Sequence, residues 1–491
     1  MNSKTRRKPK EVTLADAGKM LRGEDNETLV KMILDWAKDD DGLRERLILY
    51  AARRSGSNSH AVAVQRAFDA AVEVEGYVDY REAFDWARGV DDAIDSIEQL
   101  LDDGQATAAI EVCESALQSL LAAIESVDDS GGEFGGLSDR LQDIHYRACR
   151  AARPDPVDLA DRLLQTQLHN DFGVFDGAAE KYKRILGAEG MKAYRELAEA
   201  EWAKVPARTA KNDGSTSEHH YRITRIMESL ARASGDVEEL GAVMSRDLSS
   251  AYRYWQIATV YREARQHDRA LLWAEKGLKA FPERTDERLR EFAAEEYHRR
   301  RRYDEAMQVM WAAFVERPSP QEFKTLQRHA KKAGVWPDYR ERALREIRSG
   351  IAKSKEKPPG LAGTRWLGGS DHSVLVEIFL DEGNAEDAWR EAGVGGCSDA
   401  LWLRLAAVRE KEHPEDAAPI YLRYGEAGVA RESAGRYEEA VGLLVKAAAA
   451  MKRMGQSVEF VQHLEALRAK YKIKRNFIKL VEKKRKVLYL E

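Results

Sequence analysis

The stretch "YWQIATVYREARQHDRALLWAEKGLKAFP", from Tyr254 to Pro282, decides the fold class of this chain. Each half carries apolar and small residues at the three- and four-residue intervals of an amphipathic helix, and the polar segment "REARQHD" separates the two halves. Two antiparallel helices approach closely where alanine or glycine lies, so we expect Ala270, Ala274 and Gly277 at the contact between them. The large side chains of Tyr254 and Tyr261 would fill the space that remains.

The same spacing recurs farther along the chain. The first copy consists of Tyr254, Ile257, Ala258, Tyr261, Ala270, Ala274, Gly277 and Pro282, and the second of Ala293, Ala294, Tyr297, Ala306, Met310, Ala313 and Pro318. This spacing resembles that of tetratricopeptide repeats. One helix pair is too small to bury its apolar face, so such pairs stack on one another. The sequence therefore predicts an all-α fold, a helical-repeat solenoid of antiparallel helix pairs.

A basic run, "YHRRRRYDEA", lies at the turn of the second copy. Arg299 to Arg302 occupy the place that Gly-Arg holds in "AGRYEEA", where Gly435 precedes an alanine by five residues. Gly104 and Gly383 precede an alanine by the same distance. The run has two interpretations, a solvated turn between helices, which charge runs usually are, or a functional basic loop. The repeat spacing favours the turn.

The composition is that of a helical protein with a sizeable core. Of its 491 residues, 43% are hydrophobic and 33% are charged, and only 34 glycines and 12 prolines interrupt the chain. No stretch alternates convincingly like a strand, and the segment "VPARTAKNDGSTSE", residues 205–218, marks the best domain boundary. We predict a disordered basic tail (1–11), an N-terminal helical domain (12–204), tetratricopeptide-like repeats (219–349), a linker loop (350–370), and further repeats with a basic C-terminal capping helix (371–491).

The spacing of the cysteines and the lack of long apolar runs favour a location in the cytoplasm. Cys113, Cys149 and Cys397 lie far apart in the sequence, unlike a disulfide framework, and this favours a reducing environment. No apolar segment follows the basic start "MNSKTRRKPKEV", so we expect no signal peptide. No run approaches the roughly 18 apolar residues of a membrane-spanning helix. We therefore expect a cytoplasmic protein with no membrane partner.

Positive charge is concentrated at both ends of a chain whose formal net charge is −5. Residues 1–10 carry five Lys or Arg and no acid, and residues 468–486 carry ten and one acid, Glu482. The apolar stripe of the last helix consists of Ile473, Phe477, Leu480 and Val481. Two interpretations stay open, a capping helix with the polar outer face that a solenoid needs, or a face that binds phosphate or an acidic protein. The candidate contact residues are Lys472, Arg475, Lys479, Lys483, Lys484, Arg485 and Lys486.

The sequence carries none of the common catalytic motifs. It has no Gly-x-Ser-x-Gly, phosphate loop, dinucleotide fingerprint or His-Glu-x-x-His. His145 and Cys149 share a helix face and could begin a metal site, but the sequence nominates no further ligands. We therefore predict no enzyme, no cofactor and no metal. Whether Cys113 converges with this pair in space stays open.

Long segments resemble the helical region that follows the finger in bacterial SWIM zinc finger family proteins. The matching stretches include "DDSGGEFGGLSDRLQDIHYRACRAARPDPVDLADRLL", "YRITRIMESLARASGD" and "GGCSDALWLRLAAVREKEHPEDA". The finger itself needs Cys-x-Cys followed by Cys-x-His to hold zinc, and this chain has no Cys-x-Cys. The resemblance implies a helical scaffold without its zinc module, from a family whose finger is supposed to bind DNA or protein.

The leading functional hypothesis is a non-enzymatic intracellular scaffold for protein–protein interaction. Stacked helix pairs expose a groove that can hold a peptide or a partner's helix. The alternative is a nucleic-acid-associated regulatory protein that uses the basic C-terminal helix and the N-terminal tail. The acidic remainder of the chain repels phosphate, which weighs against DNA lying along the repeats. The sequence says nothing of the oligomeric state.

Overall fold

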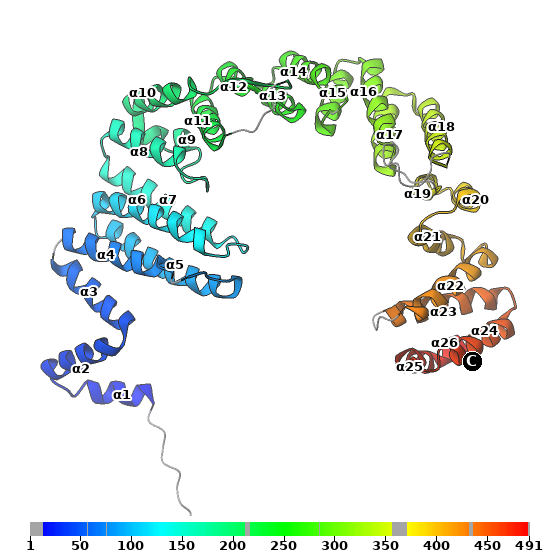
Figure 1. The fold of residues 1–491 in the computed structure, drawn as a ribbon, viewed down its shortest axis with the longest axis horizontal. Helices are drawn as coiled ribbons and strands as arrows, with labels where there is room; N and C mark the ends of the chain where they lie inside the picture. Colours follow the sequence, from blue (N-terminus) through cyan, green and yellow to red (C-terminus); the bar gives the residue numbers. More distant parts are fainter. Residues whose placement is uncertain are drawn as a thin grey trace, which may run out of the picture. The chain divides into compact units, whose positions relative to one another are not determined.

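The computed structural model describes residues 13–55, 57–74, 76–211, 217–283, 285–355, 371–431 and 436–489. Nearly all of these residues are helical, and neighbouring helices lie side by side within each part of the chain (Figure 1). The all-α helical-repeat fold with antiparallel helix pairs is confirmed. The chain divides into two compact units, Met1–Ser249 and Ser250–Glu491. The predicted disordered tail, residues 1–11, lies outside the described residues.

The first unit consists of helices that pack on others close to them in the sequence, together with two short strands. Its elements are α1 (Leu14–Leu21), α2 (Asn26–Asp39), α3 (Asp41–Ser55), α4 (Ser57–Val72), α5 (Tyr80–Asp102), α6 (Ala106–Ala123), η1 (Ile124–Ser126), α7 (Glu133–Ala152), α8 (Pro156–Leu168), α9 (Ala178–Lys181), α10 (Lys183–Trp202), β1 (Arg208–Thr209), α11 (Glu218–Ser234), α12 (Val237–Met244) and β2 (Asp247–Leu248).

Helix α6 is a long helix of largely apolar and small residues. The segment Ala106–Ser126 is long and apolar enough to cross a membrane by length and composition alone. Its buried side chains, among them Ala109, Cys113 and Leu117, face the neighbouring helices, and α6 contacts α4, α5 and α7. Because three helices pack against α6, its apolar composition is that of a core helix.

The boundary between the units does not lie at residues 205–218, as the sequence predicted, but at Ser249 and Ser250. Strand β1 pairs in parallel with β2, so that Arg208 lies opposite Asp247, and an ion pair of 3.3 Å joins their side chains. The Arg246 guanidinium lies over the ring of Trp202, 4.3 Å from its centroid. These long-range contacts hold the loop and the helices after it in the first unit, and a sequence pattern does not reveal them.

The second unit contains the repeats that the sequence identified. Its helices are α13 (Ala251–Glu263), α14 (His267–Ala280), α15 (Glu287–Arg299), α16 (Tyr303–Glu316), α17 (Pro320–Ala333), α18 (Trp336–Lys355), α19 (Ser373–Asp381), α20 (Ala385–Gly395), α21 (Asp399–Arg409), α22 (Pro414–Ala430), α23 (Arg436–Arg453), α24 (Ser457–Lys470), α25 (Arg475–Lys483) and α26 (Arg485–Leu488).

The small residues of the repeats lie where helices meet. Ala270 and Ala306 are fully buried. A Cβ added at Gly277 would lie 2.6 Å from Cβ of Tyr254 and 2.7 Å from Cδ2 of Leu289, closer than real Cβ contacts come. Glycine at this position therefore sets how closely α14 approaches α13 and α15. The predicted phase of the repeat is confirmed.

Five of the described turns between successive helices share one geometry. In each, a residue with positive φ follows the first helix, and the next backbone N–H donates to a carbonyl five residues earlier, as in a Schellman motif. The donor and acceptor pairs are Gln105 and Leu100, Gln266 and Tyr261, Arg302 and Tyr297, Asn384 and Phe379, and Gln456 and Met451. Glycine supplies the positive φ in most of these turns, but Arg265 (φ 60°) and Arg301 (φ 58°) supply it in two. Because a side chain is disfavoured there, these two turns carry backbone strain.

The predicted linker begins later than the sequence suggested. Residues 350–355 are helical, because α18 continues past Gly350 to Lys355. Ile347 and Ile351 are both buried, so the apolar face of the helix extends across the glycine and holds the last turn in place. The rest of the predicted linker, residues 356–370, lies outside the described residues.

Helices α25 and α26 cover the C-terminal end of the second unit. Phe477, Val481 and Leu488 are fully buried, and both helices contact α23. Ile473, which the sequence placed in the same apolar stripe, is instead 82% exposed. The reason is that α25 begins only at Arg475, so Ile473 lies in the preceding turn and does not follow the helical period.

Candidate functional site

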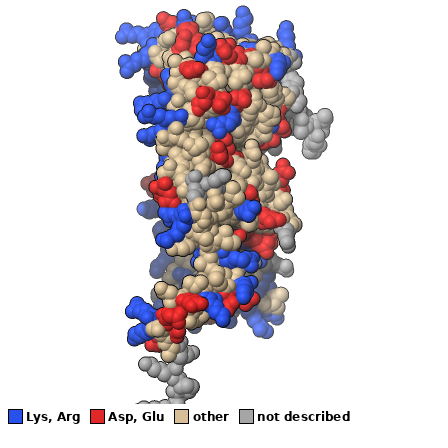
Figure 2. Space-filling model, turned by 90° about the vertical axis from the view of Figure 1, so that its left-hand side faces the viewer, with Lys and Arg blue, Asp and Glu red and all other residues tan. Residues whose placement is uncertain are grey.

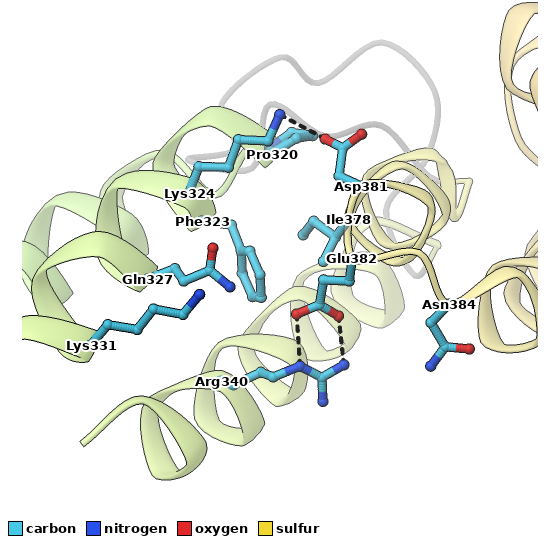
Figure 3. Close-up of a pocket in the computed structure, with 10 residues that line it drawn as sticks. All are labelled: Pro320, Phe323, Lys324, Gln327, Lys331, Arg340, Ile378, Asp381, Glu382 and Asn384. Carbon is cyan, nitrogen blue, oxygen red and sulfur yellow. Dashed lines mark hydrogen bonds and ion pairs between the residues drawn. The ribbon is translucent and has the colours of Figure 1, made fainter. Parts of the chain in front are cut away.

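A pocket opens between two successive helix pairs of the second unit, and its cavity volume is about 520 Å³ (Figure 3). The residues that line it come from α17, α18, α19 and the turn before α20. They are Pro320, Phe323, Lys324, Gln327, Lys331, Arg340, Ile378, Asp381, Glu382 and Asn384. Phe323 and Ile378 are buried and form an apolar floor.

Two ion pairs border the pocket and hold its walls together. Lys324 Nζ lies 2.7 Å from Asp381 Oδ2. Arg340 donates from Nε and Nη2 to the two carboxylate oxygens of Glu382, at 2.8 and 2.6 Å (Figure 3). The fork-to-fork geometry of the second pair fixes α18 against the end of α19. These charges are satisfied within the chain and are held in defined positions before any ligand binds.

Other polar groups of the pocket are available to a ligand. The side chains of Lys331 and Gln327, one turn apart on α17, have no hydrogen-bond or ion-pair partner among the described residues. An ammonium and an amide beside an apolar floor can hold a partner's apolar side chain together with a carboxylate or a backbone carbonyl. No sequence pattern predicts this pocket, because its two sides come from helices separated by about one helix pair and a linker.

A row of ion pairs runs across the first helices of the successive pairs. It joins α13 to α15 through Arg262 and Glu295 at 2.9 Å, and α15 to α17 through Glu291 and Arg328. Lys324 and Arg404 then both pair with Asp381, at 2.7 and 2.6 Å, and so join α17 and α21 to α19. The row, which we call the ion-pair ladder, places opposite charges side by side along these helices.

The arginine run at the turn between α15 and α16 is also paired with acids. Arg300 lies 2.8 Å from the buried Glu296 and 2.9 Å from Asp268. Arg302 lies 2.9 Å from Glu305, and its guanidinium lies over the ring of Tyr297. The interpretation of the run as a turn between helices is confirmed, and these two arginines bind neighbouring elements of the same unit.

The seven basic residues predicted as contacts all lie exposed on the C-terminal cap, as we call residues 472–488. Arg485 has an interaction within the chain, and its guanidinium lies 5.7 Å from the centroid of the Tyr489 ring. The side chains of the other six have no hydrogen-bond or ion-pair partner among the described residues, and they are Lys472, Arg475, Lys479, Lys483, Lys484 and Lys486. Elsewhere the charges are mixed, and on the face drawn in Figure 2 basic and acidic side chains are interspersed.

His145 and Cys149 are buried next to each other in the first unit. The Cys149 sulfur lies 3.7 Å from Nε2 of His145, and the ring nitrogens of His145 lie 2.8 Å from the Tyr182 hydroxyl and 3.1 Å from a Glu114 oxygen. Burial raises the pKa of the Cys149 thiol to about 12 and also raises that of Cys113. Both thiols are therefore protonated at neutral pH in the buried core.

The described residues contain one group of three side chains close enough to share a metal ion. It consists of His413, Glu415 and Asp416, at the start of α22. Asp416 already pairs with Arg409 at 2.7 Å, and His413 lies 3.2 Å from Glu415. Arg409 thus already neutralises Asp416, and the cysteines and His145 are not part of this group.

A buried histidine pair joins α15 to α17. Nε2 of His298 lies 3.1 Å from Nδ1 of His329, and the rings stack with centroids 5.1 Å apart. Burial, together with the nearby cations of Arg328 and Lys332, lowers the pKa of His329 to about 4. The outer ring nitrogens, Nδ1 of His298 and Nε2 of His329, have no hydrogen-bond partner in the part of the chain that the structure describes. A second proton on either ring would therefore have no acceptor.

A model of a protein family of unknown function, DUF6880, matches residues 19–346, which is more than half of the chain. The chain belongs to this family. Within this DUF6880 protein the match covers most of the first unit and continues into α18. It ends before α19, which supplies the other side of the pocket, and before the cap. No curated protein matches the chain.

Three solved structures are similar over most of their length. "Circular tandem repeat protein with novel repeat topology and enhanced subunit contact surfaces" is 16% identical, covers 94% of this chain and 92% of its own, and has a TM-score of 0.21. "Crystal structure of APC/C hetero-tetramer Cut9-Hcn1" is 10% identical, with coverages of 86% and 96% and a TM-score of 0.17. "Structure of Naa15/Naa10 bound to HypK-THB" is 11% identical, with coverages of 96% and 80% and a TM-score of 0.22. Such low scores transfer no function to this chain.

Proposed function

We propose that this DUF6880 protein is a non-enzymatic, cytoplasmic scaffold whose helix pairs bind another protein. The observation that carries the proposal is the pocket between α17 and α19. Its walls are fixed by Lys324 with Asp381 and by Arg340 with Glu382, while Lys331 and Gln327 remain available to a ligand. A preformed pocket with an apolar floor and charged edges suits a short segment of a partner protein, since little is lost in ordering it.

The ion-pair ladder supports the same proposal. Opposite charges alternate along the first helices, so this surface repels neither sign strongly and favours a partner with mixed polar character. The cations of the ladder are each paired with an acid, so the ladder offers no continuous basic track of the kind that a nucleic-acid backbone requires.

Two predictions from the sequence stay predictions. The resemblance to the helical region of SWIM zinc finger proteins is separate from the DUF6880 match. Association with nucleic acid through the cap and the N-terminal tail is the alternative function, and the experiment on the cap below includes it.

The test of the proposal is partner capture with a variant that fills the pocket. The tagged full chain is expressed in the organism of origin, and bound proteins are identified by quantitative mass spectrometry. Gln327→Trp places an indole in the pocket, and Lys332→Trp is the matched control, because Lys332 is exposed on the same helix and does not line the pocket.

We expect specific proteins to bind the unmodified chain and the Lys332→Trp control, and to be reduced roughly tenfold on Gln327→Trp, as for an interaction centre that loses its anchor. Capture of no protein above background contradicts the scaffold proposal. Equal capture by all three chains places the binding surface elsewhere than in the pocket.

A further inference from the structure

The outer face of helix α25 carries a line of like charges. Arg475, Lys479 and Lys483 follow one another at four-residue intervals and so lie on one side of the helix. All three are exposed. Phe477 and Val481 are buried on the opposite side against the body of the second unit. The cap therefore has two separate faces, one that packs and one that points to solvent.

Packing within the chain does not explain this outer face. Like charges at four-residue intervals destabilise a helix, and the first turn of α25 has no acid to balance its N-terminal dipole. The one acid on the helix, Glu482, lies 2.6 Å from Arg468 of α24 and does not neutralise the line. In contrast, arginines on the first helices, such as Arg262 and Arg404, pair with acids of an adjacent helix pair.

Two exposed apolar side chains lie near these cations in the sequence. Ile473, in the turn before α25, is 82% exposed, and Val487, in α26, is 49% exposed. A phosphate backbone would leave both side chains in water, whereas a protein segment with acidic and apolar residues would cover them and satisfy the cations. The cap thus combines positive charge with accessible apolar surface.

Two aromatic rings near the cap, those of Tyr471 and Tyr489, already contact side chains of the same chain. Lys470 and Lys474 lie over the ring of Tyr471, 5.3 and 5.6 Å from its centroid. The Tyr489 ring faces Arg485, and its hydroxyl donates to Glu465. Because free aromatic faces are what single-stranded nucleic acids stack on, this arrangement favours a protein ligand over a nucleic acid.

We propose that the outer face of the C-terminal cap binds a segment of a partner protein that carries acidic residues on one face and aliphatic residues beside them. This inference rests on the proposed function, since it names the chemistry of one partner segment. It adds a second contact surface, formed by Arg475, Lys479 and Lys483 with Ile473 and Val487, to the pocket between α17 and α19.

The test uses a defined probe and the full chain. The probe is a fluorescent synthetic helical peptide with glutamates on one face and leucines beside them, and binding is read by anisotropy at low and physiological salt. The cap variant is Arg475→Gln, Lys479→Gln, Lys483→Gln. The matched control, Lys279→Gln, Arg301→Gln, Lys332→Gln, removes the same charge from exposed positions elsewhere in the second unit.

We expect the cap variant to weaken peptide binding about tenfold, and the control by less than about twofold, because each exposed charge contributes a modest share. Ile473→Ser should weaken it several-fold at every salt concentration, since that contact is apolar. A peptide with glutamine in place of glutamate should bind poorly. Unchanged secondary structure by circular dichroism shows that the cap variant is folded.

Three results would overturn the inference. Equal peptide binding by the cap variant and the control excludes the cap as the surface. Tighter binding of duplex DNA or of phosphatidylserine vesicles than of the peptide, lost in the cap variant, assigns the cap to nucleic acid or to lipid. If the cap variant binds the peptide normally while Gln327→Trp loses its partners from the host, the cap inference fails and the proposed function stands.

Discussion

Gly277→Ala measures how closely two helices of the repeat approach. The new Cβ would lie 2.6 Å from Cβ of Tyr254 and 2.7 Å from Cδ2 of Leu289. Leu289 can move its side chain, but Cβ of Tyr254 is bound directly to the backbone of α13, so the helix itself must shift. Overpacking of this kind costs about 1–3 kcal/mol, while alanine gains about 1 kcal/mol over glycine inside a helix. We expect a net loss of up to about 2 kcal/mol.

Gly442→Ala is the matched control in the same unit. Gly442 lies inside α23, and a Cβ added there would meet no atom within 4 Å. Only the helix propensity then acts, and we expect this variant to stabilise its surroundings by about 1 kcal/mol. The same substitution should therefore have opposite signs at two helical glycines.

Amide hydrogen exchange on the full chain separates the two effects, because it reports opening free energies locally. Peptides from α13 and α14 should exchange faster in Gly277→Ala, and peptides from α22 and α23 should exchange more slowly in Gly442→Ala. If amides of α13 and α14 exchange as slowly in Gly277→Ala as in the unmodified chain, these helices do not approach as closely as the structure shows. A shift of both variants in one direction would refute the argument from contact distances.

Three further predictions concern the core, its histidines and metal. Ala270→Arg or Ala306→Arg should each lower the melting temperature strongly, since overpacking of roughly 1–3 kcal/mol adds to the burial of a charge, and near-unmodified melting of both would refute the repeat phase. An unfolded imidazole titrates near 6.5 but His329 only near 4, so from about pH 6.5 down to about pH 4 the unfolded chain binds a proton that the folded unit does not. The free energy of opening of α15 and α17, measured by amide exchange, should therefore fall by up to about 3 kcal/mol over this pH range, and by distinctly less in His329→Gln. Equal losses in the two chains would show that protonation of His329 is not the cause. Elemental analysis should find no stoichiometric zinc, and one zinc per chain, lost together with the fold in Cys149→Ser, would restore a metal site.

The sequence was sufficient for the repeat itself. The spacing of Ala270 and Ala306 marks positions where helices must touch, and steric contact leaves few alternatives to a small residue there. The five-residue distance between Gly383 and the next buried alanine likewise marks a turn with positive φ. Both signals are local, so a pattern along one chain can carry them.

Features that depend on distant residues could not be predicted in the same way. The pocket unites Phe323 with Ile378, and the ion-pair ladder joins Arg262 to Glu295; in a chain so rich in charge, no pattern selects one pair among many. Ile473 was misplaced because a helical period was extended beyond the first residue of its helix. The boundary between the units was misplaced because two short strands join distant parts of the first unit.

The ion-pair ladder also has a mechanical consequence. Bending or extending the second unit separates one helix pair from the next, and each link, such as Arg262 with Glu295, resists that separation. These charges are partly exposed, so dissolved ions weaken their attraction, and at physiological ionic strength it fades over about 8 Å. The apolar contacts beneath them respond little to salt. The second unit should therefore act as a spring whose stiffness falls as the salt concentration rises, while its fold is retained.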